Sequence, residues 1–261
     1  MGLNCPMALV NAAGASVDTS ERAAQELLQL MRQRHSARMA FDPLRKIPPD
    51  HLRLVLEAAR WAPTAHNMQN YEVIVVDDVD RLGEIAAIRS EVSLVFIREN
   101  FEQLSFSEDE LSRKKTGILA RAFPPSWLTP DPNPFEMADL EHSFLGHAIQ
   151  SAPVLLIVLH DSTRRAPASE GDVLGMMSLG CVMENMWLMA QSLGISMQIL
   201  SAMSGDAVED ALRHLLGVPK SIRIGFGARL GYPPGSASST LRVRRDVEDF
   251  VHRNSFSRAT R

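Results

Sequence analysis

The run from Asp172 to Leu193, DVLGMMSLGCVMENMWLMAQSL, constrains the fold more than any other stretch of this sequence. It predicts a long helix that is apolar almost all round, so we expect this helix at the centre of the molecule. The most apolar long window, Val173–Met197, contains Glu184, Asn185 and Gln191 near its middle. These polar groups exclude a membrane span and favour a helix of a protein core.

The segments around this run predict alternating helices and strands. Amphipathic periodicity indicates helices, and short β-branched or wholly apolar stretches indicate strands. Their order along the chain, without an internal repeat, favours a single α+β domain. We predict helices at Thr19–Arg32, Ile47–Ala62, Asp172–Leu193 and Val208–Leu216, and strands at Tyr71–Asp78, Ser151–Asp161, Ile195–Leu200 and Ile222–Leu230.

Two parts of the chain lie outside this pattern. Residues 1–17 carry no basic start and only a short, broken apolar run, so we interpret them as a disordered leader before a domain over residues 18–261. Residues from about 90 to 150 form an insertion that contains the proline-dense AFPPSWLTPDPNPF. The prolines forbid regular structure, while Trp127 favours an ordered lid over a solvated linker.

The net charge limits the kinds of ligand that the protein is expected to bind, and the cysteine content indicates its cellular compartment. A formal net charge of −4 argues against a nucleic-acid-binding or membrane-surface protein, so any bound anion must be met by a local cluster of cations. Cys5 and Cys181 have no metal-ligand spacing and form no disulfide framework. We therefore expect a cytoplasmic protein, and the eight histidines show no spacing typical of a metal site.

The stretch Arg34–Arg38, RHSAR, suits a bound anion. In an extended chain successive side chains alternate between faces, so Arg34, Ser36 and Arg38 share one side. Two guanidiniums and a hydroxyl form a poor hydrophobic core, but guanidiniums bind phosphate with charge-assisted hydrogen bonds. The alternative is a solvated strand with surface arginines.

Two further polar clusters are candidates for ligand binding. The loop WAPTAHNMQNYEV concentrates Thr64, His66, Asn67 and Gln69 between a helix and a strand, which is typical of a small-molecule contact surface. The alternative is a turn whose polar groups satisfy its own backbone. Near the end of the chain, LRVRRD brings Arg242, Arg244 and Arg245 together, either as a second part of a phosphate site or as a solvated charge run.

Four blocks of the sequence, in order, resemble the FMN-dependent nitroreductase family. They are RHSARMAFDP, AARWAPTAHNMQNYEVIVV, the long helix ending LMAQSLGIS, and RVRRDVEDFVHRNSF. The resemblance implies a nitroreductase-like α+β fold, with a central mixed or antiparallel sheet between helices. It also implies a domain-swapped-like homodimer with a C-terminal extension. Asn70 and Tyr71 depart from the family pattern, which has Pro-Trp there, and the stretch Arg113–Phe135 does not align with short family members.

The resemblance also implies a set of FMN-binding residues. By position, Arg34 binds the phosphate, Ser36 lies on the ribityl side, and Arg38 stabilises negative charge at N1 and O2 of the flavin. The loop that begins at Pro63 reaches the cofactor of the neighbouring subunit, and the backbone near Ser201 lies beside flavin N5. The implied cofactor-binding residues are Arg34, His35, Ser36, Arg38, Pro63, Thr64, Ala65, Asn67, Gln69, Ile199, Leu200, Ser201, Ala202, Arg242 and Arg244.

The activity implied by the resemblance is the transfer of two electrons from NAD(P)H, through FMN, to a small-molecule acceptor such as a nitroaromatic or a quinone, in a ping-pong cycle. The protein would supply orientation and electrostatics, with no certain catalytic side chain and no metal. Other chemistries on the same fold remain alternatives: reductive dehalogenation, flavin fragmentation or dehydrogenation. A non-catalytic FMN-binding protein and a structural α+β protein with solvated arginines are further alternatives.

Overall fold

The computed structural model describes residues 19–89, 94–104, 107–120, 129, 133–167, 169–235 and 241–256. The leader predicted for residues 1–17 therefore lies outside the described residues, as does most of the proline-dense segment. The chain divides into two units, Met1–Arg34 and His35–Arg261. Each unit is described by itself.

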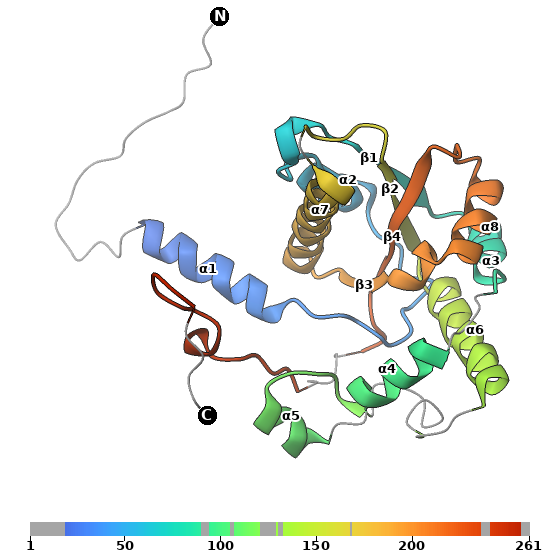
Figure 1. Cartoon of the computed structure of the whole chain (residues 1–261). Coiled ribbons are helices and arrows are strands. Elements are labelled where there is room, and N and C mark those ends of the chain that lie inside the picture. The colour runs from blue at the N-terminus through green and yellow to red at the C-terminus, as the bar shows by residue number, and fades with distance from the viewer. Residues whose placement is uncertain are drawn as a thin grey trace, which may run out of the picture. The chain divides into compact units, whose positions relative to one another are not determined.

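A four-stranded antiparallel sheet forms the centre of the second unit (Figure 1). Its strands are β1 (Tyr71–Val76), β2 (Val154–Asp161), β3 (Ser196–Leu200) and β4 (Ile222–Gly231), in the order β1-β2-β4-β3. The predicted strands are thereby confirmed. β2 is buried along almost its whole length, as expected for a wholly apolar strand in the interior of a sheet.

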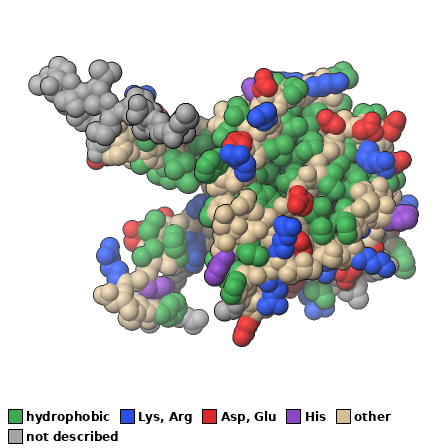
Figure 2. All heavy atoms as spheres, turned by 90° about the horizontal axis from the view of Figure 1, so that it is seen from above, with side chains coloured by type: hydrophobic (Ala, Val, Ile, Leu, Met, Phe, Trp, Pro, Cys, Tyr) green, Lys and Arg blue, Asp and Glu red, His purple; other side chains and the backbone are tan. Residues whose placement is uncertain are grey.

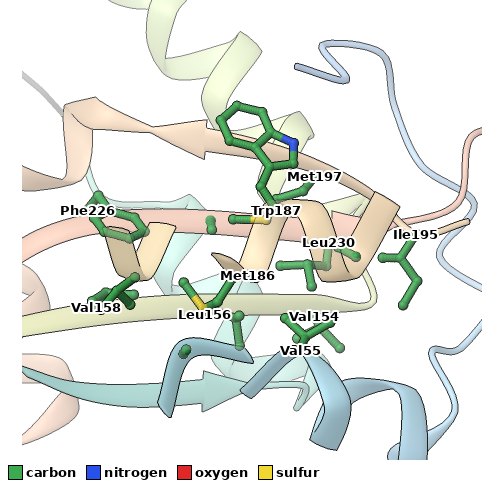
Figure 3. Close-up of a cluster of buried hydrophobic side chains, with 14 of the residues drawn as sticks. Val55, Val154, Leu156, Val158, Met186, Trp187, Ile195, Met197, Phe226 and Leu230 are labelled. Carbon is green, nitrogen blue, oxygen red and sulfur yellow. The ribbon is translucent and has the colours of Figure 1, made fainter. Parts of the chain in front are cut away.

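Two helices cover one face of the sheet. α2 (Pro49–Arg60) begins at a proline pair that suits the first turn of a helix, and α7 (Val173–Ser192) packs beside it. Figure 3 shows the core between these helices and the sheet, where Val55 of α2 and Met186 of α7 meet side chains of β2 and β4. This core is the larger of the two that flank the sheet.

Three helices cover the opposite face. They are α3 (Val79–Ala86), α6 (Pro134–Gln150) and α8 (Asp206–Leu216). Leu82, Ile149 and Leu212 contribute one buried side chain from each helix to a second core, against the alternate side chains of β2. A sheet with helices on both faces confirms the predicted α+β class.

The remaining helices are α1 (Thr19–Gln33) in the first unit, and α4 (Leu94–Leu104) and α5 (Glu108–Lys114) in the predicted insertion. α5 begins at a capping box, in which Ser107 accepts a hydrogen bond from the Glu110 amide and the Glu110 carboxylate accepts one from the Ser107 amide. Helical structure therefore occupies the described parts of the insertion. Whether the proline-dense segment within it is a lid stays a prediction.

α7 differs from the prediction in one respect. By length and composition it is apolar enough to cross a membrane, but its Leu179, Val182 and Met186 lie in the core. Its opposite face is not covered, since the side chains of Met176 and Met177 are 51% and 62% exposed. The predicted central position of the helix thus applies to one face in the single chain, because an apolar sequence does not distinguish a core face from an uncovered one.

Candidate functional site

The predicted anion-binding stretch lies in extended conformation beside the edge strand β3. Ser36 forms an isolated parallel bridge with Met197, and the Ala37 amide donates a hydrogen bond of 3.1 Å to the Met197 carbonyl. After Arg38 the chain turns toward the end of β4, where the Asp42 amide donates a hydrogen bond of 2.8 Å to the Tyr232 carbonyl. The sequence prediction of an extended segment is confirmed.

Burial differs from residue to residue in this segment. Ala37 is 5% exposed and lies in a small core with Phe41, while Ser36 and Arg38 are only half-buried. Burial lowers the pKa of the Arg38 guanidinium. Arg38 is thus a cation held partly away from water, where its electrostatic interactions are stronger than at an exposed site.

Arg34 and His35 fall on either side of the boundary between the two units. The Arg34 amide donates a hydrogen bond of 3.0 Å to the carbonyl of Leu30, which continues α1 within the first unit. His35 is half-buried at the start of the second unit. The sequence prediction that Arg34 acts together with Arg38 stays a prediction.

A buried arginine that sequence reasoning missed holds the segment around Arg38. Arg229 of β4 is fully buried, and its Nη2 donates hydrogen bonds of 2.8 Å to the Ala37 carbonyl and 2.6 Å to the Met39 carbonyl. These two carbonyls flank Arg38 in the chain. Arg229 thereby fixes the main chain on both sides of the residue predicted to face the flavin.

The other donors of Arg229 are also used. Nε donates to Oε1 of Gln198 at 2.7 Å, and Nη1 donates to the Ala148 carbonyl at 3.1 Å and to Oγ of Ser151 at 3.5 Å. The guanidinium carbon lies 4.1 Å from the centre of the Phe41 ring. Burial lowers the pKa of Arg229 to about 10, so the side chain remains charged at neutral pH.

The polar loop after α2 is ordered by its own hydrogen bonds and by α7. The Ala65 amide donates to Oγ of Ser178 at 3.0 Å. The Gln69 amide donates to Oγ1 of Thr64 at 3.1 Å, and Nε2 of Gln69 donates to Oδ1 of Asn67 at 3.1 Å. This pattern bears out the alternative of a turn that satisfies its own backbone.

The same loop carries backbone strain, which points beyond a simple turn. His66, Asn67 and Gln69 have φ angles of 51°, 51° and 45°, in the left-handed region, which Gln adopts less readily than His or Asn. Such strain is concentrated at functional sites when the surroundings enforce it. Pro63, Asn67 and Gln69 are exposed, while Thr64 and Ala65 are half-buried.

The segment after β3 leaves the sheet in a short 3-10 turn. Leu200 is buried in the core and Ile199 is half-buried, whereas Ser201 is exposed and begins a single 3-10 turn over Ser201–Ser204. A small pocket of about 30 Å³ lies against Leu200 and Ala202, between α3, α6 and α8. Its lining is apolar apart from His142, so it suits an apolar group rather than a phosphate.

The arginines near the end of the chain are exposed. Arg242 and Arg244 lie in a tail without regular structure, and Nη1 of Arg244 donates to the Val243 carbonyl at 2.7 Å. An ion pair between Lys115 and Asp246 joins this tail to the residue that follows α5. Their predicted role as phosphate ligands stays a prediction.

Metal ligands do not gather in the part of the chain that the structure describes. No group of three or more His, Cys, Asp or Glu side chains that could hold a metal ion occurs there.

These elements define an α+β protein with a cationic segment beside the edge of an antiparallel sheet. The Nitroreductase family matches residues 31–232, which is more than half of the chain, and the protein belongs to this family. A search of the curated proteins finds no match.

Several solved structures share the fold. An FMN-dependent nitroreductase from Clostridium difficile aligns with a TM-score of 0.55 and 16% identity over 88% of this chain and 99% of its own. A Desulfovibrio desulfuricans protein solved in complex with FMN aligns at 0.57 and 20% over 88% and 98%. The Vibrio harveyi NADPH:FMN oxidoreductase, solved with NAD+, aligns at 0.56 and 16% over 89% and 79%.

Proposed function

We propose that this protein is an FMN-dependent NAD(P)H oxidoreductase that reduces a nitroaromatic or quinone-type acceptor by two electrons in a ping-pong cycle. The observation that carries the proposal is the pairing of Ser36 with Met197. It brings two segments that the family resemblance assigns to flavin binding, His35–Arg38 and Ile199–Ala202, to the same edge of one sheet.

The chemistry of the side chains in this region fits FMN. The guanidinium of Arg38 is a partly buried cation, suited to stabilise negative charge that develops on a bound ring system. Main-chain amides that follow β3 are suited to hold a ring nitrogen by hydrogen bonding. When bound, FMN accepts a hydride from NAD(P)H and passes two electrons to the acceptor.

The proposal includes a homodimer, and uncovered apolar side chains support it. α1 has no buried residue, and Leu27 and Met31 on its apolar face are 49% and 43% exposed. Hydrophobic side chains also gather on the face of the second unit that Figure 2 shows. Val173, the first residue of α7, is 58% exposed. Apolar faces of this kind are typical of large obligate interfaces.

The dimer would also explain the strained loop of Pro63–Gln69. Its exposed side chains, with Asn67 and Gln69 at positive φ, would contact the cofactor of the neighbouring subunit. The exposed Arg242 and Arg244 would complete the phosphate site with Arg34. A static light-scattering mass of one chain, with FMN still bound, would contradict this part of the proposal.

The acceptor is proposed to be apolar and flat. The pocket beside Leu200 and Ala202 supports this choice, because its lining offers apolar surface and a single titratable side chain, His142. α6, which belongs to the predicted insertion, forms one wall of that pocket. The insertion would thus influence which acceptor is used.

The first experiment measures bound flavin. We expect the purified protein to be yellow, and we expect Arg38→Ala and Arg34→Ala to lower FMN occupancy, judged by absorbance after gel filtration. Arg53→Ala, which removes an exposed arginine of α2, is the matched control and should retain its flavin. Full occupancy in both Arg34→Ala and Arg38→Ala would overturn the assigned site.

A second experiment separates the enzyme from its alternatives. Addition of NAD(P)H should bleach the bound flavin, and a nitroarene or quinone should restore the colour with steady turnover. Bleaching without recovery by these acceptors would favour another chemistry on the same fold. Absence of bleaching would favour a flavin-binding protein without turnover, and a colourless protein that takes up no FMN would favour a structural role.

A further inference from the structure

We propose that Arg229 is a positioning residue for the flavin site, and that it acts by fixing the main chain on both sides of Arg38. This inference rests on the proposed function. It assigns a role to a fully buried side chain of β4.

The hydrogen bonds at Nη2 carry this inference. One nitrogen of Arg229 reaches the carbonyls of both Ala37 and Met39, at 2.8 Å and 2.6 Å. These two hydrogen bonds hold the carbonyl before Arg38 and the carbonyl after it. They restrict rotation of the peptide units between them, and so determine the direction in which the Arg38 side chain leaves the main chain. A planar guanidinium with fixed donor directions suits this task, and a lysine does not.

Arg229 is itself held rigidly. Gln198 of the neighbouring strand β3, the Ala148 carbonyl in the last turn of α6 and Ser151 receive its remaining hydrogen bonds. A cation at the carboxyl end of a helix is favoured by the helix dipole. Arg229 therefore fixes the main chain at Arg38 relative to the sheet and to α6.

The packing of Phe41 closes this arrangement. Its ring lies against the guanidinium of Arg229, and a Cβ at Gly231 would approach the Cδ2 atom of that ring to 2.6 Å. The absence of a side chain at Gly231 therefore lets Phe41 cover Arg229. This contact seals the cation from water on one side.

The acceptors of Arg229 are all neutral. They are three main-chain carbonyls, one amide and one hydroxyl, so its charge is dispersed by dipoles and is not cancelled by a carboxylate in these hydrogen bonds. The short segment Ala37–Met39 consequently carries one cation, Arg38, and lies against a second, Arg229. The neutral dipoles around Arg229 satisfy its donors in the interior, so its role is to hold the main chain rather than to contact a ligand.

A double-mutant cycle tests the inference. FMN affinity is measured by flavin fluorescence titration for the wild type, Arg38→Ala, Arg229→Met and the double variant, each as the full chain. We expect Arg229→Met to weaken FMN binding about tenfold, equivalent to the loss of one good charge-assisted interaction. We expect the double variant to bind FMN as Arg38→Ala does, within about twofold, because Arg229 acts through Arg38.

Two further variants separate positioning from stability and from charge. Arg223→Met alters another arginine of β4, six residues away, and should lower the unfolding temperature while leaving FMN affinity unchanged. Arg229→Lys keeps the charge but lacks the planar fork, and should weaken FMN binding as much as Arg229→Met. If Arg229→Met does not fold, Arg229→Lys takes its place in the cycle.

The outcomes distinguish this inference from the proposed function. A wild type that binds no FMN overturns the proposed function and, with it, this inference. A wild type that binds FMN, with equal weakening by Arg229→Met in the presence and absence of Arg38, overturns the positioning role alone. Unchanged FMN affinity in the Arg229 variants, or full rescue by lysine, does the same.

Discussion

Arg223 and Arg229 lie on the same strand, β4, but the fold treats their charges in opposite ways. Nε of Arg223 donates to both carboxylate oxygens of Glu209, at 2.7 Å and 2.9 Å. Arg229 meets only carbonyl, amide and hydroxyl oxygens. The charge of Arg223 is compensated locally by a carboxylate, whereas that of Arg229 is dispersed over neutral dipoles.

The interactions of the two arginines also differ in which partner is buried, the arginine or its acceptor. The Arg223 side chain is 53% exposed while its partner Glu209 is only 3% exposed, so the carboxylate is the desolvated member of that pair. On Arg229 the cation itself is desolvated. The difference indicates that the Arg223 pair anchors α8 to the sheet, while Arg229 organises the segment at the sheet edge.

The largest expected effect is a difference in unfolding free energy between Arg229→Met and Arg223→Met. Arg229→Met removes the donor to the carbonyls of Ala37 and Met39 and to Oε1 of Gln198, and each buried group left unsatisfied costs about 1–3 kcal/mol. We therefore expect the free energy of unfolding in urea to fall by about 3 kcal/mol or more. Arg223→Met, which leaves a carboxylate that still accepts from the Ile224 amide, should cost about half as much. Equal losses would contradict the distinction drawn between the two residues.

A smaller effect concerns pH and Glu209. Burial opposes the charged form of Glu209, but hydrogen bonds from Arg223 and the Ile224 amide outweigh it, and the pKa of Glu209 lies below its ordinary value of 4.5. This stabilisation is fully present above pH 4.5 and is lost as the pH falls through the lowered pKa of the folded state. We expect Glu209→Gln to cost about 2 kcal/mol near neutral pH.

The measurement is the difference in unfolding free energy between wild type and Glu209→Gln as a function of pH. This difference should shrink as the medium is acidified below the ordinary carboxyl pKa, because the wild type then loses the same charge. Gln198→Leu, a matched change of the neutral acceptor on Arg229, should give a difference that does not vary over the same range. A constant difference for Glu209→Gln would show that its charge contributes nothing.

The contrast also explains what the sequence predicts well and what it does not. The extended conformation of this segment is local, so it can be predicted from RHSAR without knowledge of the fold. The partner of that segment, β3, lies far along the chain and cannot be read from local periodicity. The stretch IRIGFGARL predicts a strand, but not that Arg229 is desolvated and Arg223 is not.

A signal for Arg229 was present, although sequence reasoning did not use it. Gly227, Ala228 and Leu230 place it in an apolar, central strand, where an arginine must be buried with partners of its own. The register shift between Val158 and Leu159 changes which β4 residues share a face, so simple alternation fails there. The positive φ angles of His66 and Asn67 likewise depend on contacts that only the folded chain supplies.

The smallest expected effect concerns Ser151, and it tests how much its hydroxyl contributes to holding Arg229 compared with the other hydrogen-bond acceptors. Oγ of Ser151 accepts from Nη1 of Arg229 at 3.5 Å and from the Phe41 amide at 3.4 Å, both long contacts, and donates to Ala148 at 3.1 Å. Ser151→Ala should therefore cost only about 1 kcal/mol in unfolding free energy. Ser192→Ala removes a similar hydroxyl at the exposed end of α7 and should cost less than about 0.5 kcal/mol. A loss at Ser151 as large as that at Arg229 would mean that the hydroxyl, and not the pair of carbonyls flanking Arg38, is the principal anchor of the guanidinium.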